Sequence, residues 1–522
     1  MTPPIERPDT TASVHARSRA HEHVSIAIVG AGFAGIGMGI RLKRRGEHSF
    51  RIFERAERIG GTWRDNTYPG IACDVPSHLY SFSFAPNPNW RQKYADGAEI
   101  AEYLETCVTQ DHLTEHIQLG TDVYDMRWGE STQCWQLYTS QGKFTADMLI
   151  MAAGRLSKPR IPNVDGATEF AGEWFHSAAW RHDVDLVGKR VGIIGSGASA
   201  VQLVPELAAV AGELIVMQRS APYVIPRDDE QYSDAQRRTF ARLPESMAEL
   251  RAQLFWKQEE VFTQRLSDGP SVARARETAL NHLRSHVSDE RLVQLLTPHY
   301  EIGCKRILIS NTYYPVFMQP HVHLQSTALA RVEGNSIIGN DGSRFEVDVL
   351  VYSTGFHSAR QPYALTVFGR DGQSLAEAWR DGMRGFASTT VHGFPNFFVL
   401  NGPNAGLGHS SSIYMMETQI DYVLGALTHL QQSGVASIEV RAEAEQAYVN
   451  AIDALSAETV WMNGGCSSWY VDAAAGRLTL LWPDFAHAFR AANGQFDAAA
   501  YVSVHRRALD AEHPELSKGQ NR

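Results

Sequence analysis

Two stretches of the chain share one pattern of hydrophobic and polar positions. In each, a short apolar run is followed by a glycine-rich turn, a helix rich in small residues and a second apolar run. The first stretch covers residues 24–54 and the second covers residues 190–220. Apolar runs of this length predict buried parallel strands, so both stretches are expected to form strand–turn–helix–strand units.

The turn of the first unit has the spacing of a dinucleotide-binding loop. Such glycines permit a tight turn and bring a pyrophosphate close to the helix N-terminus. The second strand ends at Glu54, which is placed to accept a hydrogen bond from a ribose hydroxyl. The alternative is a glycine-rich helix start in another α/β fold. The glycines of this Gly-x-Gly-x-x-Gly are Gly30, Gly32 and Gly35.

The second unit differs from the first where its second strand ends. Arg219 and Ser220 stand there in place of an acidic residue. An acidic residue would repel a 2'-phosphate, whereas these two would bind it, so the site is expected to prefer NADPH over NADH. The alternative for Arg219 is a solvated surface arginine. The turn of this unit contains Gly195, Gly197 and Ala200.

Two such units indicate a protein with two cofactors, FAD in the first unit and NADPH in the second. Two further strands, entering Ala153-Gly154 and Thr354-Gly355, are typical of flavoprotein oxidoreductases and are interpreted as the crossings between cofactor domains. The alternative interpretation is that these segments are simply two more buried strands and do not cross between domains. The expected fold is α/β, with two Rossmann-like domains, the second inserted in the first, and a helical insertion.

The expected domain organisation follows from these units and from proline-bearing links. It comprises a flexible tail at 1–22, an FAD-binding domain at 23–160 and 385–522, an NADPH-binding domain at 185–360 with a helical insertion at about 228–300, and linkers at 161–184 and 361–384.

Composition narrows the functional class. A formal net charge of -10 over 522 residues disfavours a nucleic-acid binder. No apolar run is long enough to span a bilayer and the N-terminus lacks the core of a signal peptide, so a cytoplasmic protein is expected. The five scattered cysteines predict no disulfide scaffold, zinc site or redox dithiol. No metal is expected, although His15, His21 and His23 could bind one adventitiously.

Two longer motifs, the segments 60–74 (GGTWRDNTYPGIACD) and 170–183 (FAGEWFHSAAWRHD), resemble fingerprints of the Baeyer–Villiger monooxygenases. The segment 170–183, between the two units, is similar to one of them, although Arg181 stands where that fingerprint has Pro or Asp. The segment 60–74 (GGTWRDNTYPGIACD), which reads as neither helix nor strand, fills every position of the second. The resemblance extends from Val24 to about Asp484. The matching residues are Phe170, Gly172, His176 and Trp180, and Gly60, Gly61, Trp63, Tyr68, Pro69, Gly70 and Asp74.

The resemblance implies a reaction. NADPH reduces FAD, O2 adds to give a flavin C4a-peroxide, and this attacks a ketone to form a tetrahedral adduct that rearranges to an ester or lactone. Sulfides are possible further substrates. The implied partners are a small ketone and O2, with no nucleic acid and no membrane span, in a monomer or weak homo-oligomer. Which ketone is used does not follow from the sequence.

The resemblance also implies roles for single residues. Arg306, in GCKRILI, matches an arginine that stabilises the peroxide charge, and Asp74 matches the carboxylate that orients it. Lys305 matches a lysine that contacts the 2'-phosphate of NADP. If the two residues lie on a strand, alternation would point the side chains of Lys305 and Arg306 to opposite faces. Thr62 and Trp63 are expected on the flavin side. Among the remaining matches, Trp461 is expected to close over NADP, and His176 and Trp180 to couple domain movement to cofactor binding.

Three alternatives remain open. A flavin-containing monooxygenase for nitrogen or sulfur would use the protonated hydroperoxide and does not need the Asp74–Arg306 pair. An NADPH oxidase or flavin reductase would pass electrons on without inserting oxygen. A protein that keeps nucleotide folds only for structure is disfavoured by the intact glycines and by Glu54, Asp74 and Arg306.

Overall fold

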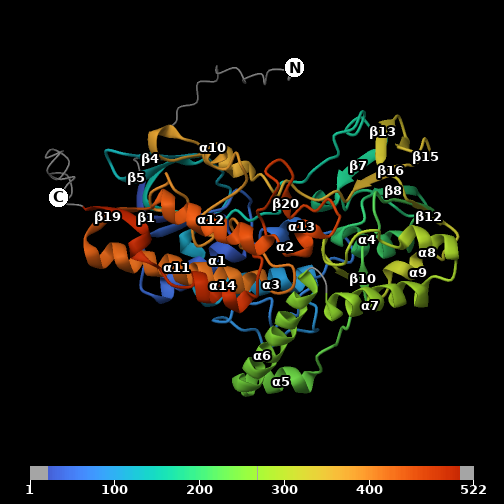
Figure 1. Cartoon of the computed structure of the whole chain (residues 1–522), viewed down its shortest axis with the longest axis horizontal. Helices are drawn as coiled ribbons and strands as arrows, with labels where there is room; N and C mark the ends of the chain where they lie inside the picture. The colour runs from blue at the N-terminus through green and yellow to red at the C-terminus, as the bar shows by residue number, and fades with distance from the viewer. Residues whose placement is uncertain (1–21, 267–268, 506–522) are drawn as a thin grey trace.

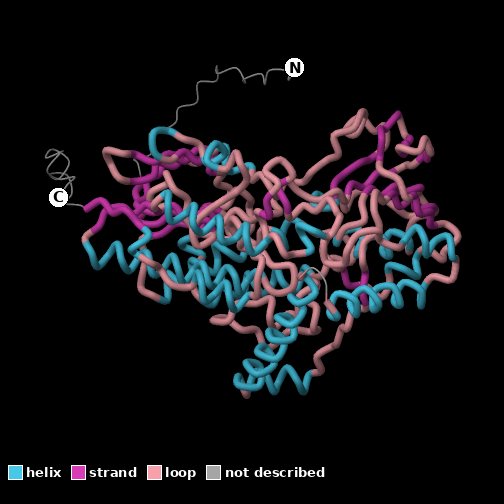
Figure 2. The backbone as a smooth tube through the Cα atoms, in the orientation of Figure 1, coloured by secondary structure: helices cyan, strands magenta, loops and turns pink. Residues whose placement is uncertain are grey.

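Two sheets with separate hydrophobic cores organise the chain. The computed structural model describes residues 22–266 and 269–505. Figure 1 shows one lobe built on the first sheet and the C-terminal helices, and a second lobe built on residues from the middle of the chain. The segments between the two sheets run mostly as loops (Figure 2). The expected α/β class and the two-unit organisation are confirmed by these sheets.

The first sheet combines a parallel core with an antiparallel edge. Its order is β17-β4-β5-β6-β1-β2-β3, and β18 pairs with the second half of β6, beyond the residues that pair with β5. Strands β18, β6, β1, β2 and β3 are parallel, as the apolar runs predicted. The strands are β1 (Glu22–Val29), β2 (Phe50–Phe53), β3 (Ile117–Gln118), β4 (Val123–Gly129), β5 (Cys134–Thr139), β6 (Gly142–Met151), β17 (Val367–Phe368) and β18 (Phe397–Val399).

The second sheet is parallel throughout, with the order β12-β9-β8-β16-β7. It contains β7, although residues 161–184 were expected to be a linker. Likewise β17 lies in the first sheet inside the expected linker 361–384. The strands are β7 (Glu173–His176), β8 (Arg190–Ile194), β9 (Glu213–Met217), β12 (Val322–Gln325) and β16 (Val349–Tyr352). The smaller sheets contain β10 (Val224–Ile225), β11 (Leu308–Ile309), β13 (Leu329–Glu333), β14 (Ser336–Gly339), β15 (Arg344–Glu346), β19 (Val435–Val440), β20 (Val471–Asp472), β21 (Arg477–Leu478) and β22 (Tyr501–His505).

The helices include the two that follow the glycine-rich turns, α1 and α4, and the insertion expected near 228–300. That insertion forms α5 to α8, of which α5 and α6 extend below the junction of the lobes (Figure 1). The helices are α1 (Phe33–Arg44), α2 (Thr62–Asp65), α3 (Gly97–Gln110), α4 (Ala198–Ala208), α5 (Asp234–Arg242), α6 (Pro244–Val261), α7 (Pro270–His286), α8 (Glu290–Leu296), α9 (Tyr313–Val316), α10 (Leu375–Ala378), α11 (Ser412–Ser433), α12 (Ala442–Ser456), α13 (Val460–Asn463) and α14 (Ala486–Asn493).

A buried carboxylate attaches α6 to the C-terminal part of the chain. Glu259 accepts hydrogen bonds from His409 at 3.1 Å, from the His487 ring at 2.6 Å and from the backbone N–H groups of Ala486 and His487 at 3.0 Å. Burial raises the pKa of Glu259, but these donors outweigh it and lower the pKa to about 2. The charged form is therefore the one that stabilises this contact.

We expect Glu259→Gln to lower the free energy of unfolding by about 1.5–3 kcal/mol, since hydrogen bonds to a buried charge are lost. Because the pKa of Glu259 is lowered from 4.5, its stabilisation is present above pH 4.5 and is lost as pH falls toward 2. Urea denaturation and hydrogen exchange at α14 measure the effect. Glu260→Gln, on the exposed neighbour, is the control. Equal midpoints for the two variants would contradict the assignment.

Two of the five cysteines are bonded to each other. Cys304 and Cys466 form a disulfide, at a sequence separation of 162 residues. The sequence predicted no disulfide scaffold and did not anticipate this single pair, because spacing along the chain says nothing about cysteines that only the tertiary fold brings together. Cys73, Cys107 and Cys134 are free.

No helix within residues 22–266 and 269–505 is both long enough and apolar enough to cross a bilayer. His15 and His21 of the expected tail lie outside these ranges. His23 contacts Thr145 and Asp147 on β6.

Candidate functional site

The turn after β1 has no room for side chains. Gly30 has a φ of +109°, and a Cβ on it would lie 2.6 Å from the carbonyl oxygen of Ala152. A Cβ on Gly35 would lie 1.9 Å from the carbonyl oxygen of Gly30. The turn therefore requires glycine at both positions and brings bare backbone to the N-terminus of α1, the arrangement that binds a pyrophosphate.

Glu54 follows β2 directly and is 5 % exposed. Its carboxylate accepts hydrogen bonds from the backbone N–H of Ala31 at 2.9 Å and of Ala56 at 3.0 Å, and forms an ion pair with Arg64 at 2.9 Å. These contacts hold the carboxylate beside the turn that contains Gly30. Its position is the one expected for an acceptor of ribose hydroxyls.

The turn after β8 repeats this geometry. Gly195 has a φ of +127°, and a Cβ on it would lie 2.2 Å from the carbonyl oxygen of Ser353, next to the Thr354-Gly355 crossing. Gly197 precedes α4 and faces open space, while Ala200 is fully buried. The space at Gly197 leaves the N-terminus of α4 accessible to an anion.

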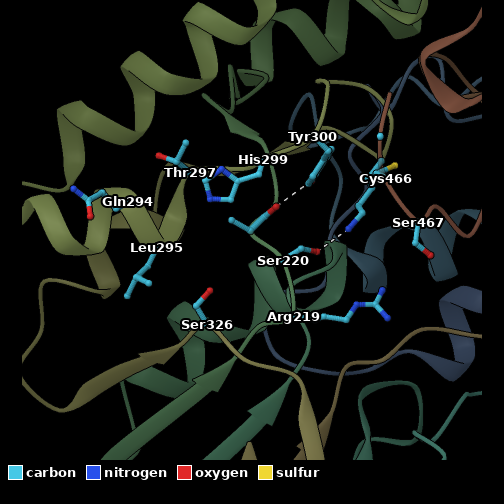
Figure 3. A pocket seen from close by; sticks show the side chains of 13 residues that line it. Arg219, Ser220, Gln294, Leu295, Thr297, His299, Tyr300, Ser326, Cys466 and Ser467 are labelled. Atoms are coloured by element: carbon cyan, nitrogen blue, oxygen red, sulfur yellow. Dashed lines mark hydrogen bonds between the residues drawn. The ribbon is translucent and has the colours of Figure 1, made fainter. Parts of the chain in front are cut away.

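A cavity of about 420 Å³ lies beside this second turn and contains the predicted cations (Figure 3). Arg219, Ser220 and Lys305 line it. Nζ of Lys305 donates a hydrogen bond to the Ser220 hydroxyl at 2.6 Å. Burial lowers the pKa of Lys305, and the nearby charge of Arg219 lowers it further. Neither cation forms an ion pair with a carboxylate of the described residues, so an anion fits between them.

The segment 60–74 connects the two glycine-rich turns. A Cβ on Gly61 would lie 3.2 Å from the Cα of Gly32 in the first turn. Further along, the Tyr68 hydroxyl donates to the side chain of Gln202 on α4 at 2.8 Å, and Gln202 donates to the carbonyl of Ala72 at 2.8 Å. A Cβ on Gly70 would lie 2.9 Å from the Gln202 carbonyl. The segment thus leads from the first cofactor turn to the helix of the second.

Asp74 ends this segment and meets Arg306, 232 residues away. The guanidinium donates two hydrogen bonds, from Nε at 2.6 Å and from Nη2 at 2.7 Å, to the two carboxylate oxygens. Burial alone would raise the pKa of Asp74, but the charge and hydrogen bonds of Arg306 lower it. In turn, the charge of Asp74 raises the pKa of Arg306. The predicted contact between these residues is confirmed, and both remain charged.

Two local predictions differ from the structure. Lys305 and Arg306 were expected on a strand, but they precede β11 in an irregular loop. The loop conformation, and not strand alternation, sends Lys305 to Ser220 and Arg306 to Asp74. The segment 60–74 was expected to contain no helix, yet Thr62 begins α2, a helix of four residues.

The indoles in the predicted set differ in burial. Trp63 is partly buried, and its Nε1–H donates to the Tyr80 hydroxyl at 3.2 Å. Trp461 is 2 % exposed and packs in a hydrophobic cluster with Phe262 and Tyr470. In this structure Trp461 therefore supports the C-terminal segment from inside, and its closing over NADP stays a prediction.

The first fingerprint lies in the second lobe. Phe170 is buried, and a Cβ on Gly172 would lie 2.5 Å from the carbonyl oxygen of Asp348. His176 ends β7, and burial lowers its pKa to about 4, so it is neutral. Trp180 packs edge-on against Phe175. These contacts are structural, and a role in domain coupling stays a prediction.

Arg181, which departs from the fingerprint, is an exposed residue. Its guanidinium pairs with Asp183 at 2.6 Å and with Glu173 at 2.9 Å. Both partners belong to the same stretch of chain, so this substitution forms a local surface network and does not alter the contact between Asp74 and Arg306.

Sequence reasoning missed two further cations, half-buried Arg155 and buried Arg265, of which Arg265 lies close enough to Arg306 for their charges to interact. Arg155 donates to the carbonyl of Leu480 at 2.8 Å and Arg265 to that of Gly408 at 3.2 Å. Burial lowers the pKa of each to about 10, and neither pairs with a carboxylate of the described residues. Tyr470 lies among them: burial raises its pKa, and the charges of Arg306 and Arg265 oppose this.

Of Arg155, Arg265 and Tyr470, only Arg155 has a position in the sequence that could have indicated a role in the site. Arg155 directly follows the predicted crossing at Ala153-Gly154, so its place near a cofactor could have been noticed. Arg265 belongs to the helical insertion and Tyr470 to the C-terminal part of the chain, where nothing in the local pattern indicates a site. The guanidinium groups of Arg155, Arg265 and Arg306 make this region positively charged.

The sequence comparisons agree with this geometry. Residues 27–254 match the family model described as pyridine nucleotide-disulphide oxidoreductase. A protein of Streptomyces coelicolor named Baeyer-Villiger monooxygenase is 41 % identical over 92 % of this chain and 93 % of its own length. One of Pseudomonas aeruginosa with the same name is 42 % identical over 92 % of each chain.

Solved structures are similar over nearly the whole chain. An oxidised steroid monooxygenase bound to NADP superposes with a TM-score of 0.81 at 30 % identity, covering 92 % of this chain and all of that one. A closed crystal structure of cyclohexanone monooxygenase superposes with a TM-score of 0.83 at 25 % identity, covering 93 % of this chain and all of that one.

Proposed function

This chain belongs to the Baeyer–Villiger monooxygenase family, and from that membership we propose which of its residues bind the cofactors and which act on the reaction. The protein is an FAD-dependent NADPH monooxygenase that converts ketones to esters or lactones. The observation that supports the assignment of roles best is the forked contact between Asp74 and Arg306, placed between the two cofactor turns.

The first turn fits FAD, because Gly30 and Gly35 leave bare backbone at the N-terminus of α1. In the proposed site the pyrophosphate lies against this turn and Glu54 accepts from the ribose. Thr62 and Trp63 border the flavin because their segment packs on Gly32 through Gly61. Bound FAD supplies the chemistry that activates O2, with electrons from NADPH.

The second turn and the cavity fit NADPH. In the proposed site the pyrophosphate lies at Gly195, Gly197 and Ala200, and the 2'-phosphate is bound by Arg219, Ser220 and Lys305. The two cations and the hydroxyl converge on one cavity, which supports a group with two negative charges there.

In our proposal, Arg306 stabilises negative charge that develops on the reacting oxygens. An arginine suits this role because its charge is permanent and its donors are fixed in a plane. Asp74 accepts from Nε and one Nη, so it fixes the guanidinium and leaves the remaining N–H groups for the reactants. Asp74 is therefore a positioning residue. Buried Tyr470 and Arg265 keep water from this side of the guanidinium.

The domain division also belongs to this proposal. The FAD-binding domain comprises 23–160 and 385–522, and the NADPH-binding domain comprises 185–360, with β7 added to its sheet. We place the protein in the cytoplasm. The absence of a membrane-spanning helix among the described residues and the free thiols of Cys73, Cys107 and Cys134 are consistent with this location.

A single incubation tests the reaction. Purified protein is supplied with NADPH, 18O2, a panel of ketones and a sulfide, and the products are analysed by mass spectrometry. We expect an ester that carries one labelled oxygen. Sulfoxide from a sulfide without any ester would support nitrogen or sulfur oxidation in its place, and hydrogen peroxide as the sole product would support an oxidase.

A further inference from the structure

The disulfide joins the loop of Lys305 and Arg306 to the C-terminal segment 464–470. Cys304 is fully buried directly before Lys305, and Cys466 lines the cavity that contains Lys305 (Figure 3). The N–H of Glu301 also donates to the carbonyl of Gly464 at 2.9 Å. The two segments are therefore held together at the wall of the proposed NADPH cavity by one covalent link and a backbone hydrogen bond.

Both joined segments contain residues of the site. The first positions Lys305 against Ser220 and Arg306 against Asp74. The second contributes Ser467 to the cavity wall and contains Tyr470, whose pKa responds to the charge of Arg306. A change at the link between these segments therefore reaches the cofactor cavity and the reaction centre together.

We propose that Cys304 and Cys466 form a reversible thiol–disulfide modification site that sets how tightly NADP(H) is retained. The proposal rests on the cavity being the NADPH site. With the disulfide formed, residues 465–467 are fixed against the cavity. With both thiols free, the segment is held only by noncovalent contacts, so it leaves the cavity wall more easily and the cofactor dissociates faster.

The two positions suit reversible exchange. Cys466 is half-buried at the cavity wall, so a small thiol or disulfide can reach it, whereas Cys304 is enclosed and serves as the resolving partner. In a reducing compartment, an accessible disulfide is expected to be transient and regulatory. Of the three remaining thiols, Cys73 and Cys107 are buried, and burial raises the pKa of Cys107 to about 11. Cys134 is half-buried on β5 and is not part of the disulfide, so it serves as a control below.

Formation of the disulfide between Cys304 and Cys466 needs an oxidant, and a small-molecule disulfide supplies it by thiol–disulfide exchange. The thiolate of Cys466 attacks one sulfur of that disulfide, forms a mixed disulfide and releases the first small thiolate. The thiolate of Cys304 then attacks the Cys466 sulfur, forms the protein disulfide and releases the second small thiolate. The two protons lost by the cysteines protonate these leaving groups. Two protein thiols are thus oxidised while one small disulfide is reduced to two thiols, and a dithiol reductant reverses the step.

The test compares the full-length enzyme after treatment with oxidised glutathione and after treatment with dithiothreitol. Differential alkylation and peptide mass spectrometry report the link between Cys304 and Cys466, and calorimetry reports the Kd for NADP+. We expect the link only in the oxidised sample and an NADP+ affinity at least about fivefold weaker in the reduced sample, the lower end of typical coupling between sites. Absence of the link in the oxidised sample, or equal affinities, overturns the proposal.

Variants separate the link from general effects of the reagents. Cys466→Ser is expected to bind NADP+ as the reduced enzyme does under both treatments. Cys134→Ser, at a free half-buried cysteine on β5, is expected to keep the full response. A redox response that survives in Cys466→Ser overturns the proposal. Ester formation is measured in both states: ester with no redox effect refutes only this inference, and a redox effect on NADP+ without ester refutes only the proposed function.

Discussion

Arg306→Ala is expected to abolish most ester formation while reduction of the bound flavin by NADPH continues. The reason is that Arg306 offers donors to the reacting oxygens, whereas cofactor binding relies on the glycine-rich turns and on Lys305. Loss of one preorganised donor group of this kind typically costs about 10²–10³ in kcat. Stopped-flow absorbance measures flavin reduction, and product analysis measures ester. We expect NADPH oxidation to continue with release of hydrogen peroxide.

Variants around the pair test the geometry. Asp74→Asn keeps the shape but removes the charge that fixes the guanidinium, so a smaller loss than in Arg306→Ala is expected. Arg127→Ala is the matched control: Arg127 makes the same forked contact with Asp125, at 2.7 and 2.8 Å, but on β4 of the first sheet. Normal ester formation by Arg306→Ala, or an equal loss in Arg127→Ala, would show that the stabilising charge is elsewhere.

The double variant Arg219→Ala, Lys305→Ala is expected to remove the preference for NADPH over NADH. Hydrogen bonds to a charged group contribute about 1.5–3 kcal/mol each, or roughly 10–150-fold in affinity per contact. We therefore expect kcat/KM for NADPH to fall by roughly 10²-fold or more and kcat/KM for NADH to change little, because NADH lacks the 2'-phosphate. Steady-state rates with both cofactors give this ratio.

The ratio distinguishes phosphate binding from a general defect. An equal loss with NADH and NADPH would indicate a damaged cavity and would contradict the role of these cations. The double variant Arg238→Ala, Arg242→Ala, at two exposed arginines on α5 of the insertion, controls for the loss of two positive charges. The disulfide of Cys304 lies next to Lys305, so all measurements are made in one defined redox state.

The two cofactor units could be predicted because each is local in sequence. Their strands, helices and Gly-x-Gly spacings lie within about thirty residues, and the observed β1–α1–β2 and β8–α4–β9 units match the predicted ranges to within a few residues. The fingerprint segment 60–74 also indicated that Asp74 meets Arg306. That prediction depended on family resemblance, because no physical pattern relates positions 232 residues apart.

By itself, the sequence of this protein determined the two nucleotide-binding units, and it predicted the preference of the second for a 2'-phosphate and, through family resemblance, the residues of the reaction. The tertiary structure alone decided the loop that separates Lys305 from Arg306, the basic group of Arg155 and Arg265, and the disulfide of Cys304 and Cys466. The physical reason is the range of the forces involved. Strand and helix patterns come from neighbouring residues, whereas ion pairs, burial and disulfides depend on which distant segments the packed fold brings into contact.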